Sequence, residues 1–446
     1  MFILENGKEL TDEKLSEFIS KHRQMVDRRF IRLDKAYRTD YDIFHHPRKE
    51  AWKPDNRIGV NFAKYIVDTM NGFFMGQPIK ISVDDDASGA ISEYVEFVDQ
   101  YNGQDDNNSE LAKICDIFGR AYEMYYVDEN GNVGITYQSP MQAFMIYDDS
   151  ILERPRYFVR LYRDTDKKLH GSLSDATTVR YFDVPGDIKW RPDEDKLHGF
   201  NGVPAVEYKE NEERIGIFEP VLSMINAYNK VLSEKANDVD YFADAYLKVL
   251  GATVDADSQK QIRSNRIINF RGNGSDSVVV DFMTKPDGDN SQEHLIDRLE
   301  KLIFQNAMVA NISDENFGTS SGIALKYKLQ AMSNLAKTKE RKFTASMTKR
   351  YKLIFSNPIN SMGVDDWAKL HYHFTLNYPA NVSEEIENAK NLEGIVSEET
   401  QLKVLSIVDD VNAEIARKES EDEKYQSKLM TNDYLGGGES NADEEE

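Results

Sequence analysis

Two histidines separated by one residue are the first candidates for chemistry. His371 and His373 would point to one face of an alternating segment, where two imidazoles could chelate a metal. No third ligand is suggested nearby, so the favoured interpretation is a pair of half-exposed strand histidines. Three consecutive acids, Asp84–Asp86, could bind a hard cation, although a solvated loop is the simpler interpretation. An enzyme of the metal-dependent hydrolase type would need both groups.

The single cysteine indicates a core position. Cys115 stands among Leu111, Ile114 and Phe118 at helical spacing, which favours packing over a role as nucleophile. One cysteine also excludes an internal disulfide framework and a cysteine-based zinc site. No G-x-x-x-x-G-K-[ST], H-E-x-x-H, G-x-S-x-G or G-x-G-x-x-G motif occurs. We therefore predict no catalytic residue, no metal and no cofactor, and expect that the protein is not an enzyme.

The distribution of charge is the most informative feature of the sequence. The formal charge is 55 minus 78, or −23, which repels free nucleic acid unless positive charge is concentrated in one place. Residues 323–355 carry nine cations against the single acid Glu340, a local charge of +8 that leaves −31 for the rest. The nine are Lys326, Lys328, Lys337, Lys339, Arg341, Lys342, Lys349, Arg350 and Lys352. Nucleic acid, acids of the same chain and acids of a neighbouring subunit remain open as partners.

The elements that would position these residues are mainly helices, with one sheet region. Hydrophobic periodicity predicts helices over 12–36, 61–74, 219–247, 292–310 and 322–355, and helices broken at 102–109 within 90–126. Alternation predicts strands at 78–83, about five between 134 and 209, and further ones in RIINFR, SVVVDFM and HYHFTLNY. Short helices are expected to start at Ser383 and Ser397, with a third over 410–428. The fold class is therefore α+β, mainly α.

The chain shows no targeting or membrane-spanning segment. The first residues lack a signal-peptide core, and no 18-residue apolar run occurs, so we expect a soluble protein made in the cytoplasm. The acidic stretch after Thr431, with six carboxylates and no basic residue, is expected to be disordered.

Four segments carry a resemblance to a known family. Asn71–Ile79 reads NGFFMGQPI, Gly202–Val206 leads through Phe218-Glu219 to LSMINAYNK at Leu222–Lys230, and Phe317–Tyr327 reads FGTSSGIALKY. Asn377–Asn381 (NYPAN) precedes Gly394–Thr400 (GIVSEET). In order and spacing these segments resemble the portal family of long-tailed, siphovirus-type bacteriophages of Gram-positive hosts, over about residues 60–420.

The resemblance implies a ring, twelve subunits in the virion, built from named parts. Residues 1–218 would form the wing, 219–247 and 291–310 the two stem helices, and 248–290 the clip between them. Residues 311–321 would be the tunnel loop, 322–356 the tunnel helix, 357–382 a return to the wing, 383–430 the crown and 431–446 a disordered acidic tail.

The same resemblance implies the functional residues and partners. The tunnel loop would meet double-stranded DNA through Asn316, Phe317, Gly318, Thr319, Ser320 and Ser321. The basic tunnel-helix residues would be Lys326, Lys328, Lys337, Lys339, Arg341 and Lys342. The clip would dock the terminase large subunit and head-completion or adaptor proteins through Asp255, Asp257, Gln259, Arg263, Arg266 and Arg271. Major capsid and scaffold proteins would contact the ring at the capsid vertex, without any membrane partner.

Physical reasoning favours a conduit that holds DNA weakly. A channel that neutralised many phosphates at once would stall the duplex, so most cations of the tunnel helix should pair with acidic neighbours. A long amphipathic helix also leaves an apolar stripe, which an identical neighbour in a ring would cover. The alternatives are a DNA-binding protein that uses helix 323–355 and another structural protein of the phage head.

Overall fold

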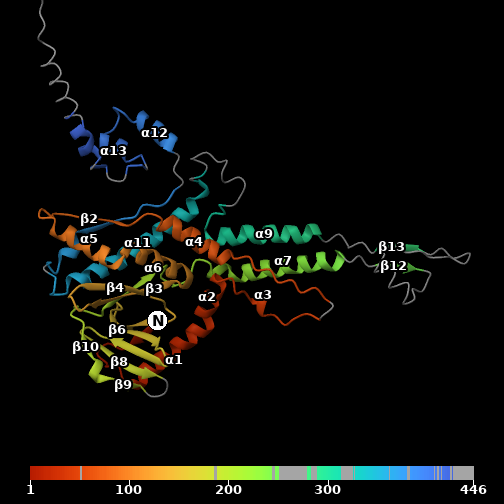
Figure 1. Ribbon diagram of the computed structural model, residues 1–446, viewed down its shortest axis with the longest axis horizontal. Coiled ribbons are helices and arrows are strands. Elements are labelled where there is room, and N and C mark those ends of the chain that lie inside the picture. The colour runs from red at the N-terminus through yellow and green to blue at the C-terminus, as the bar shows by residue number, and fades with distance from the viewer. Residues whose placement is uncertain are drawn as a thin grey trace, which may run out of the picture. The chain divides into compact units, whose positions relative to one another are not determined.

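The computed structural model describes most of the chain (Figure 1). The described residues are 1–50, 53–184, 188–243, 247–250, 279–282, 289–312, 325, 327–360, 362–378, 382–405, 407–408, 411–412, 414–421 and 424. Of these, 241–250, 279–290 and 382–384 are described as backbone alone. The chain divides into two units. One comprises Met1–Ser313 and Lys328–Asn377, and the other comprises Asp314–Tyr327 and Tyr378–Glu446.

The first helical segment of the first unit confirms the prediction for 12–36. α1 (Asp12–Met25) continues through the π-helical turn η1 (Val26–Phe30) into α2 (Ile31–Tyr37). The hydroxyl of Thr11 caps the start by accepting a hydrogen bond from the Lys14 amide at 3.3 Å. The π-helical turn was not predicted. It shifts the register of the apolar stripe, so Leu15, Phe18 and Ile19 face one cluster while Phe30 faces another.

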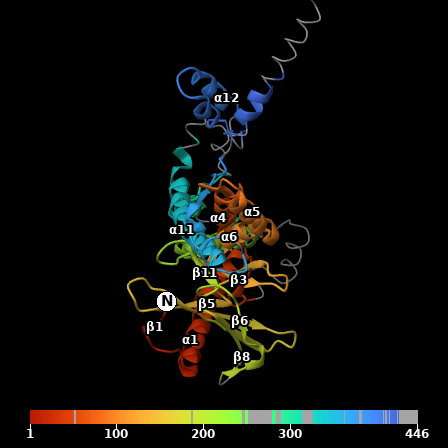
Figure 2. The same ribbon diagram turned by 90° about the vertical axis from the view of Figure 1, so that its left-hand side faces the viewer.

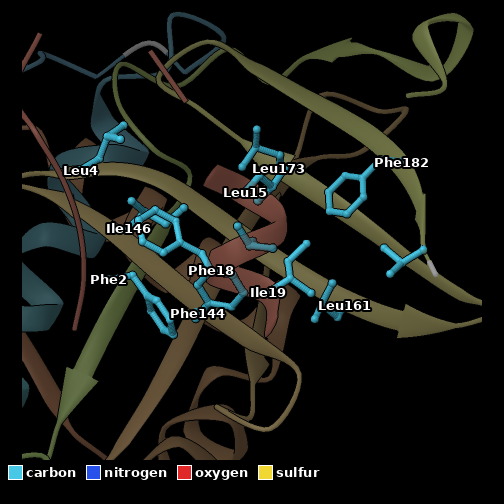
Figure 3. Close-up of a cluster of buried hydrophobic side chains, with 12 residues drawn as sticks. Phe2, Leu4, Leu15, Phe18, Ile19, Phe144, Ile146, Leu161, Leu173 and Phe182 are labelled. Atoms are coloured by element: carbon cyan, nitrogen blue, oxygen red, sulfur yellow. The ribbon is translucent and has the colours of Figure 1, made fainter. Parts of the chain in front are cut away.

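A seven-stranded sheet lies against α1. Its order is β1-β5-β6-β7-β8-β10, with β9 paired to β8, and all pairs are antiparallel except the parallel pair of β1 and β5. The strands are β1 (Phe2–Leu4), β5 (Ala143–Asp148), β6 (Pro155–Arg163), β7 (Leu169–Ser174), β8 (Thr178–Val184), β9 (Lys189–Trp190) and β10 (Lys196–Leu197). Figure 3 shows the cluster between helix and sheet, where Phe2, Phe18 and Phe144 meet.

A second sheet has the order β11-β3-β4 and is covered by helices. Its strands are β3 (Arg120–Val127), β4 (Val133–Gln138) and β11 (Ala205–Lys209). The region predicted as about five strands therefore belongs to two separate sheets. The short segments α3 (Asp42–His45), η2 (Pro192–Glu194) and η4 (Asp366–Lys369) connect larger elements.

The prediction for 90–126 is wrong in two respects. α5 (Ala90–Asn102) and α6 (Gln104–Phe118) are separated by Gly103 alone, so the polar stretch expected as a turn starts α6. Residues 120–126, expected as helix, form β3. Gly119 ends α6 with φ +82°, and a Cβ there would lie 2.1 Å from the carbonyl oxygen of Arg214. The following RAYEMYYV run then favours a strand because aromatic and β-branched residues suit a pleated sheet.

Two long helices enclose a short strand pair. η3 (Glu219–Val221) leads into α7 (Leu222–Ala243), and β12 (Leu247–Leu250) follows. β13 (Val279–Phe282) pairs antiparallel with β12 and leads to α9 (Asp289–Ala307). Figure 1 shows α7 and α9 side by side. The predicted helices 219–247 and 292–310 are thus present with shifted ends, SVVVDFM contains β13, and RIINFR lies outside the described residues.

The basic segment forms α11 (Gln330–Phe355), which packs against β11 and α4 (Phe62–Phe74) (Figure 2). α4 confirms the helix predicted over 61–74. The stripe predicted for the basic helix is buried at Leu329, Met332, Ala336, Phe343, Met347, Tyr351 and Ile354. β14 (Leu370–His373) pairs antiparallel with β2 (Lys80–Val83) and joins segments almost 290 residues apart. The strand predicted in HYHFTLNY is therefore shorter than expected.

The second unit contains two short helices at the predicted positions. α12 comprises Val382–Asn391, and α13 comprises Glu398–Leu402. The Ser397 hydroxyl caps α13 by accepting from the Thr400 amide at 3.4 Å. Where the backbone between 411 and 424 is described, it is helical, as predicted for 410–428. The acidic stretch 431–446 lies outside the described residues.

Candidate functional site

The basic helix α11 is the candidate site, and the structure buries part of its charge. Lys339 is 1% exposed and lies between Asp116 of α6 and Glu210, which follows β11. Its ammonium donates to Asp116 and to the carbonyl oxygen of Ala112 at 3.2 Å, and lies 3.2 Å from Glu210 Oε2. Burial alone would lower the pKa of Lys339, but the two carboxylates outweigh it, so the pKa lies above its usual value. Lys339 therefore stays charged inside the core.

Arg350 makes the second buried ion pair of the helix. Its Nε and Nη2 donate to the two carboxylate oxygens of Glu123 at 2.8 and 2.9 Å, and neither side chain is exposed. Nη2 also donates to Asn108 Oδ1 at 2.7 Å. Glu123 accepts further hydrogen bonds from the hydroxyls of Tyr125 and Tyr208 at 2.5 and 2.9 Å. A buried, bidentate pair of this kind fixes α11 to the sheet β11-β3-β4.

The other cations of the helix have several environments. Lys342 pairs with Glu212, and Lys352 lies 5.3 Å from the ring centroid of Trp367. Desolvation by neighbouring atoms, followed by repulsion from Lys209, lowers the pKa of the exposed Lys349. Lys337 and Arg341 are exposed, and no carboxylate of the described residues forms an ion pair with either. Lys328 is exposed, and Lys326 lies outside the described residues.

Paired acids therefore neutralise three of the cations within the chain itself. Lys339, Lys342 and Arg350 have partners on α6, on β3 and in the segment after β11. Among the six predicted tunnel-helix residues, Lys339 is not accessible to a ligand. The prediction that most of the nine cations pair with acidic neighbours is met by three of them among the described residues, and Lys339 and Arg350 do so because both side chains face the core rather than solvent.

The acidic partners were not identified from the sequence. Asp116 and Glu123 each interrupt an apolar or aromatic stretch, and that interruption is the signal that could have identified them, whereas Glu210 stands in the polar run KENEER and gives no such signal. A carboxylate at a core position requires a cation or hydrogen-bond donors, and the nearest surplus of cations is in residues 323–355.

The remaining candidates occupy separate places. His371 pairs with Asp84 at 2.7 Å, and His373 is hydrogen-bonded to Ser82 at 2.8 Å, both across the pair of β14 and β2. Within the described part of the chain, no group of three His, Cys, Asp or Glu side chains could hold a metal. Cys115 is buried as predicted, and burial raises the pKa of its thiol.

Two predicted sites fall outside the described residues. These are the tunnel-loop residues Asn316, Phe317, Gly318, Thr319, Ser320 and Ser321, and the clip residues Asp255, Asp257, Gln259, Arg263, Arg266 and Arg271. In the helices that are described, no segment is long and apolar enough to cross a bilayer.

Comparison with known proteins identifies the family. The family described as "Phage portal protein, SPP1 Gp6-like" matches residues 16–428, and the chain belongs to this family. A portal protein of Clostridium phage phiCD119 is 24% identical over 423 residues, covering 85% of this chain and 88% of that protein. The portal protein of Bacillus phage SPP1 is 24% identical over 424 residues, covering 88% of this chain and 81% of that protein.

One solved structure is also similar. A chain in the structure titled "Neck of empty GTA particle computed with C6 symmetry" matches with a TM-score of 0.45 at 10% identity, covering 78% of this chain and 90% of that chain. The resemblance to portal proteins of phages with Gram-positive hosts is thereby confirmed through the family and the two named relatives.

Proposed function

We propose that this chain forms a dodecameric ring at the capsid vertex, through which double-stranded DNA is packaged and ejected. The ring docks the terminase large subunit and later the head-completion or adaptor proteins, and it contacts major capsid and scaffold proteins. Its role is structural and requires no cofactor. The family match over residues 16–428 supports this proposal.

The proposed parts correspond to described elements. α7 and α9 take the place of the stem helices within 219–247 and 291–310, and β12 and β13 begin and end the clip, 248–290. α11 is the tunnel helix within 322–356, and α12 and α13 belong to the crown, 383–430. The two sheets with α1 to α6 form the wing, 1–218, which 357–382 completes through β14. Residues 311–321 remain the proposed tunnel loop, and 431–446 the acidic tail.

The helix pair carries the observation that best supports a ring. In α7 the predicted stripe is buried at Ile225 and Tyr228, half-buried at Leu232 and Ala236, and exposed at Val239, which is 61% exposed. In α9 the buried residues are Ile296, Ile303 and Ala307, whereas the predicted stripe residue Leu295 is 46% exposed. Lys235 pairs with Glu293 between the helices. Apolar surface near the strand pair is thus not covered by the described residues of one chain.

An identical neighbour would cover this surface. A heterologous contact repeated around a closed ring buries the same patch in every subunit and leaves no free end. Burying two aliphatic side chains that are half exposed stabilises each contact by roughly 1–2 kcal/mol. Twelve equal contacts would then favour the closed ring over open intermediates.

The electrostatics of α11 supports weak contact with DNA. Three of its cations are held by carboxylates of the same chain, and two exposed cations, Lys337 and Arg341, have no carboxylate partner among the described residues. Because each phosphate contact adds salt-sensitive affinity, a small number of exposed cations suits a channel in which DNA must slide.

The oligomeric mass of purified variants tests the proposal. Val239→Glu with Leu295→Glu should convert rings into smaller species in light scattering after size exclusion, with unchanged helical content. The matched control is Lys230→Glu with Lys301→Glu, at exposed residues of the same two helices, and it should leave the ring intact. A ring that tolerates the first pair as well as the control would contradict the proposed stem contact.

A further inference from the structure

A cleft in the seven-stranded-sheet region collects positive charge in this acidic protein. It lies between the end of α1 with η1 and the strands β6, β7 and β8, and its volume is about 1190 Å³. We name it the basic cleft. Its cationic lining residues are Arg23, Arg160, Arg163, Lys167, Lys168 and Lys189. Two carboxylates, Asp27 and Asp183, also line it, so the six cations leave a surplus of +4.

One of the two carboxylates is already neutralised. Asp183 accepts from His170 Nδ1 at 2.6 Å and lies 3.3 Å from Arg191 Nε. His170 also reaches Asp164 at 2.8 Å, and its hydrogen bonds to these two carboxylates, Asp164 first, raise its pKa above the usual value. The carboxylates of Asp183 and Asp164 are therefore already engaged by His170 and Arg191. They do not compensate the cations that line the cleft.

The cations of the basic cleft, by contrast, have few acidic partners: Lys168 lies 4.0 Å from Asp166, and both of these side chains are exposed. Arg160 Nε donates to the amide oxygen of Gln138 at 3.3 Å, and Arg163 Nη1 donates to the carbonyl oxygen of Lys167 at 2.9 Å. No carboxylate of the described residues forms an ion pair with Arg23, Arg160 or Arg163. Like charges gathered in a recess repel one another, so an anionic occupant would stabilise the cleft.

The lining also includes apolar surface. Leu161 and Val184 are buried, and Val26, Met141 and Leu169 are half-buried within the same cleft. His22 lines it too, with 2% exposure. Its Nε2 is 2.8 Å from the Pro140 carbonyl oxygen, whereas its Nδ1 has no partner among the described residues. Burial lowers the pKa of His22 to about 4, so the ring is neutral and Nδ1 is an unused acceptor.

We propose that the basic cleft binds an acidic peptide segment of another protein, one that carries apolar residues among its carboxylates. The cationic rim would pair with the carboxylates, and the apolar floor would take one or two aliphatic or aromatic side chains. A recess of this volume is roughly 10 Å across, which is the thickness that a strand with its side chains occupies between packed sheets.

The same features disfavour a DNA duplex as occupant. A phosphate backbone presents charge at every step but no apolar side chain for the floor of the cleft, and a duplex is wider than the recess. The inference does not depend on the proposed ring, because the cleft lies within one chain and uses none of the stem or tunnel-helix residues.

Fluorescence anisotropy with three labelled probes tests the inference. The first probe is a 12-residue peptide of glutamates with interspersed leucines, the second has the same charge with serines in place of the leucines, and the third is a 20-base-pair duplex. We expect saturable binding of the first probe, at least about fivefold tighter than the second, and weakening as salt screens the rim. Binding of the duplex as tight as that of the first probe would overturn the proposal.

Charge variants locate the site. Arg23→Glu, Lys168→Glu and Lys189→Glu together should weaken the first probe at least about tenfold, and the neutral triple with glutamines should weaken it less. The control triple Lys196→Glu, Lys230→Glu and Lys301→Glu changes the formal charge equally at exposed residues outside the cleft. Equal losses of affinity for the first probe in both glutamate triples would overturn the assignment of the binding site to the cleft. Thermal unfolding of each variant would verify that it is folded.

Discussion

The basic helix α11 and the basic cleft are both rich in cations, but the fold treats them differently. In α11, Lys339 and Arg350 point into the core and meet Asp116, Glu210 and Glu123. In the cleft, the arginines surround a recess without carboxylate partners among the described residues, and Lys168 has a single exposed partner, Asp166, at 4.0 Å. Helix α11, which has the highest density of positive charge in the sequence, is thus partly neutralised. The cations of the basic cleft, which are scattered over residues 23–189, remain available to a partner. Charge along a sequence therefore does not equal charge presented to a partner.

The two regions should also differ in what their cations contribute to stability. A buried cation with a hydrogen-bonded carboxylate is costly to leave unpaired, because the remaining charge stays in a low-dielectric surrounding. An exposed cation is hydrated and screened, so its removal changes little. Substitutions in the two regions test this contrast directly.

The largest effect is expected from Glu123→Ala. It leaves Arg350 buried without its carboxylate, and it removes the acceptor of the Tyr125 and Tyr208 hydroxyls. The free energy of unfolding should fall by about 3–5 kcal/mol in urea titration. The double variant Glu123→Leu with Arg350→Met should lose less than Glu123→Ala. A loss in the double variant that equals or exceeds the loss in Glu123→Ala would show that the Glu123–Arg350 pair is not the main attachment of α11.

A pH-dependent loss is expected from Lys339→Met. Burial raises the pKa of Asp116, while the Lys339 ammonium lowers it, so removal of Lys339 raises that pKa further. The folded variant then retains a proton that the unfolded chain releases, and its stability falls as the pH rises above the ordinary aspartate value. The deficit against the parent should be about 3 kcal/mol near pH 8 and clearly smaller near pH 5.

The contribution of Lys339 itself should not be lost at neutral pH. The pKa of Lys339 is raised, so its contribution is complete below the ordinary lysine value and is lost only as the pH passes the folded value. Urea titration at each pH measures how much less stable Lys339→Met is than the parent. A difference that stays constant between pH 5 and 8 would contradict the assignment of Asp116 and Glu210 as the partners of Lys339.

A small effect is expected from Lys342→Ala. Lys342 pairs with the exposed Glu212, whose pKa is lowered to about 2, chiefly by the hydrogen bond from Lys342 and next by that from Lys209. Surface pairs of this kind contribute roughly 0–1 kcal/mol and weaken in salt. Thermal unfolding should show a decrease in Tm relative to the parent, and this decrease should largely disappear in about 1 M NaCl. A decrease that persists there would indicate a role beyond charge pairing.

The smallest effects are expected from Arg341→Ala on α11 and Arg23→Gln in the cleft. Both side chains are exposed without a carboxylate partner in the described chain, so each change should stay within about 0.5 kcal/mol by urea titration. A large loss at Arg23 would mean that the cleft cations stabilise the fold, and the contrast between the two regions would then fail.

The helices could be predicted well because their signals are local. Thr11 and Ser397 as caps and the stripe from Leu329 to Ile354 determine where helices start and which side is buried. The end of α6 at Gly119 was missed because the reason is tertiary, namely the close approach of the Arg214 backbone. β1 was missed because three residues carry no period, and its pairing with β5 joins segments more than 140 residues apart.

The candidate site was only partly predictable for a related reason. The number of cations in 323–355 is a property of the sequence, but the burial of Lys339 and Arg350 depends on carboxylates more than 100 residues away. The basic cleft gave no local signal either, because its cations come from α1, β6, the turn after β6 and β9, and only the sheet order brings them together.

Electron microscopy of the purified full-length protein in negative stain tests the central proposal most directly. The proposal that the stripe of α7 and α9 is covered by a neighbouring copy predicts annular particles with a central channel and one dominant rotational symmetry. A preparation that remains monomeric at every concentration, with native helical content and no annular particles, would contradict it.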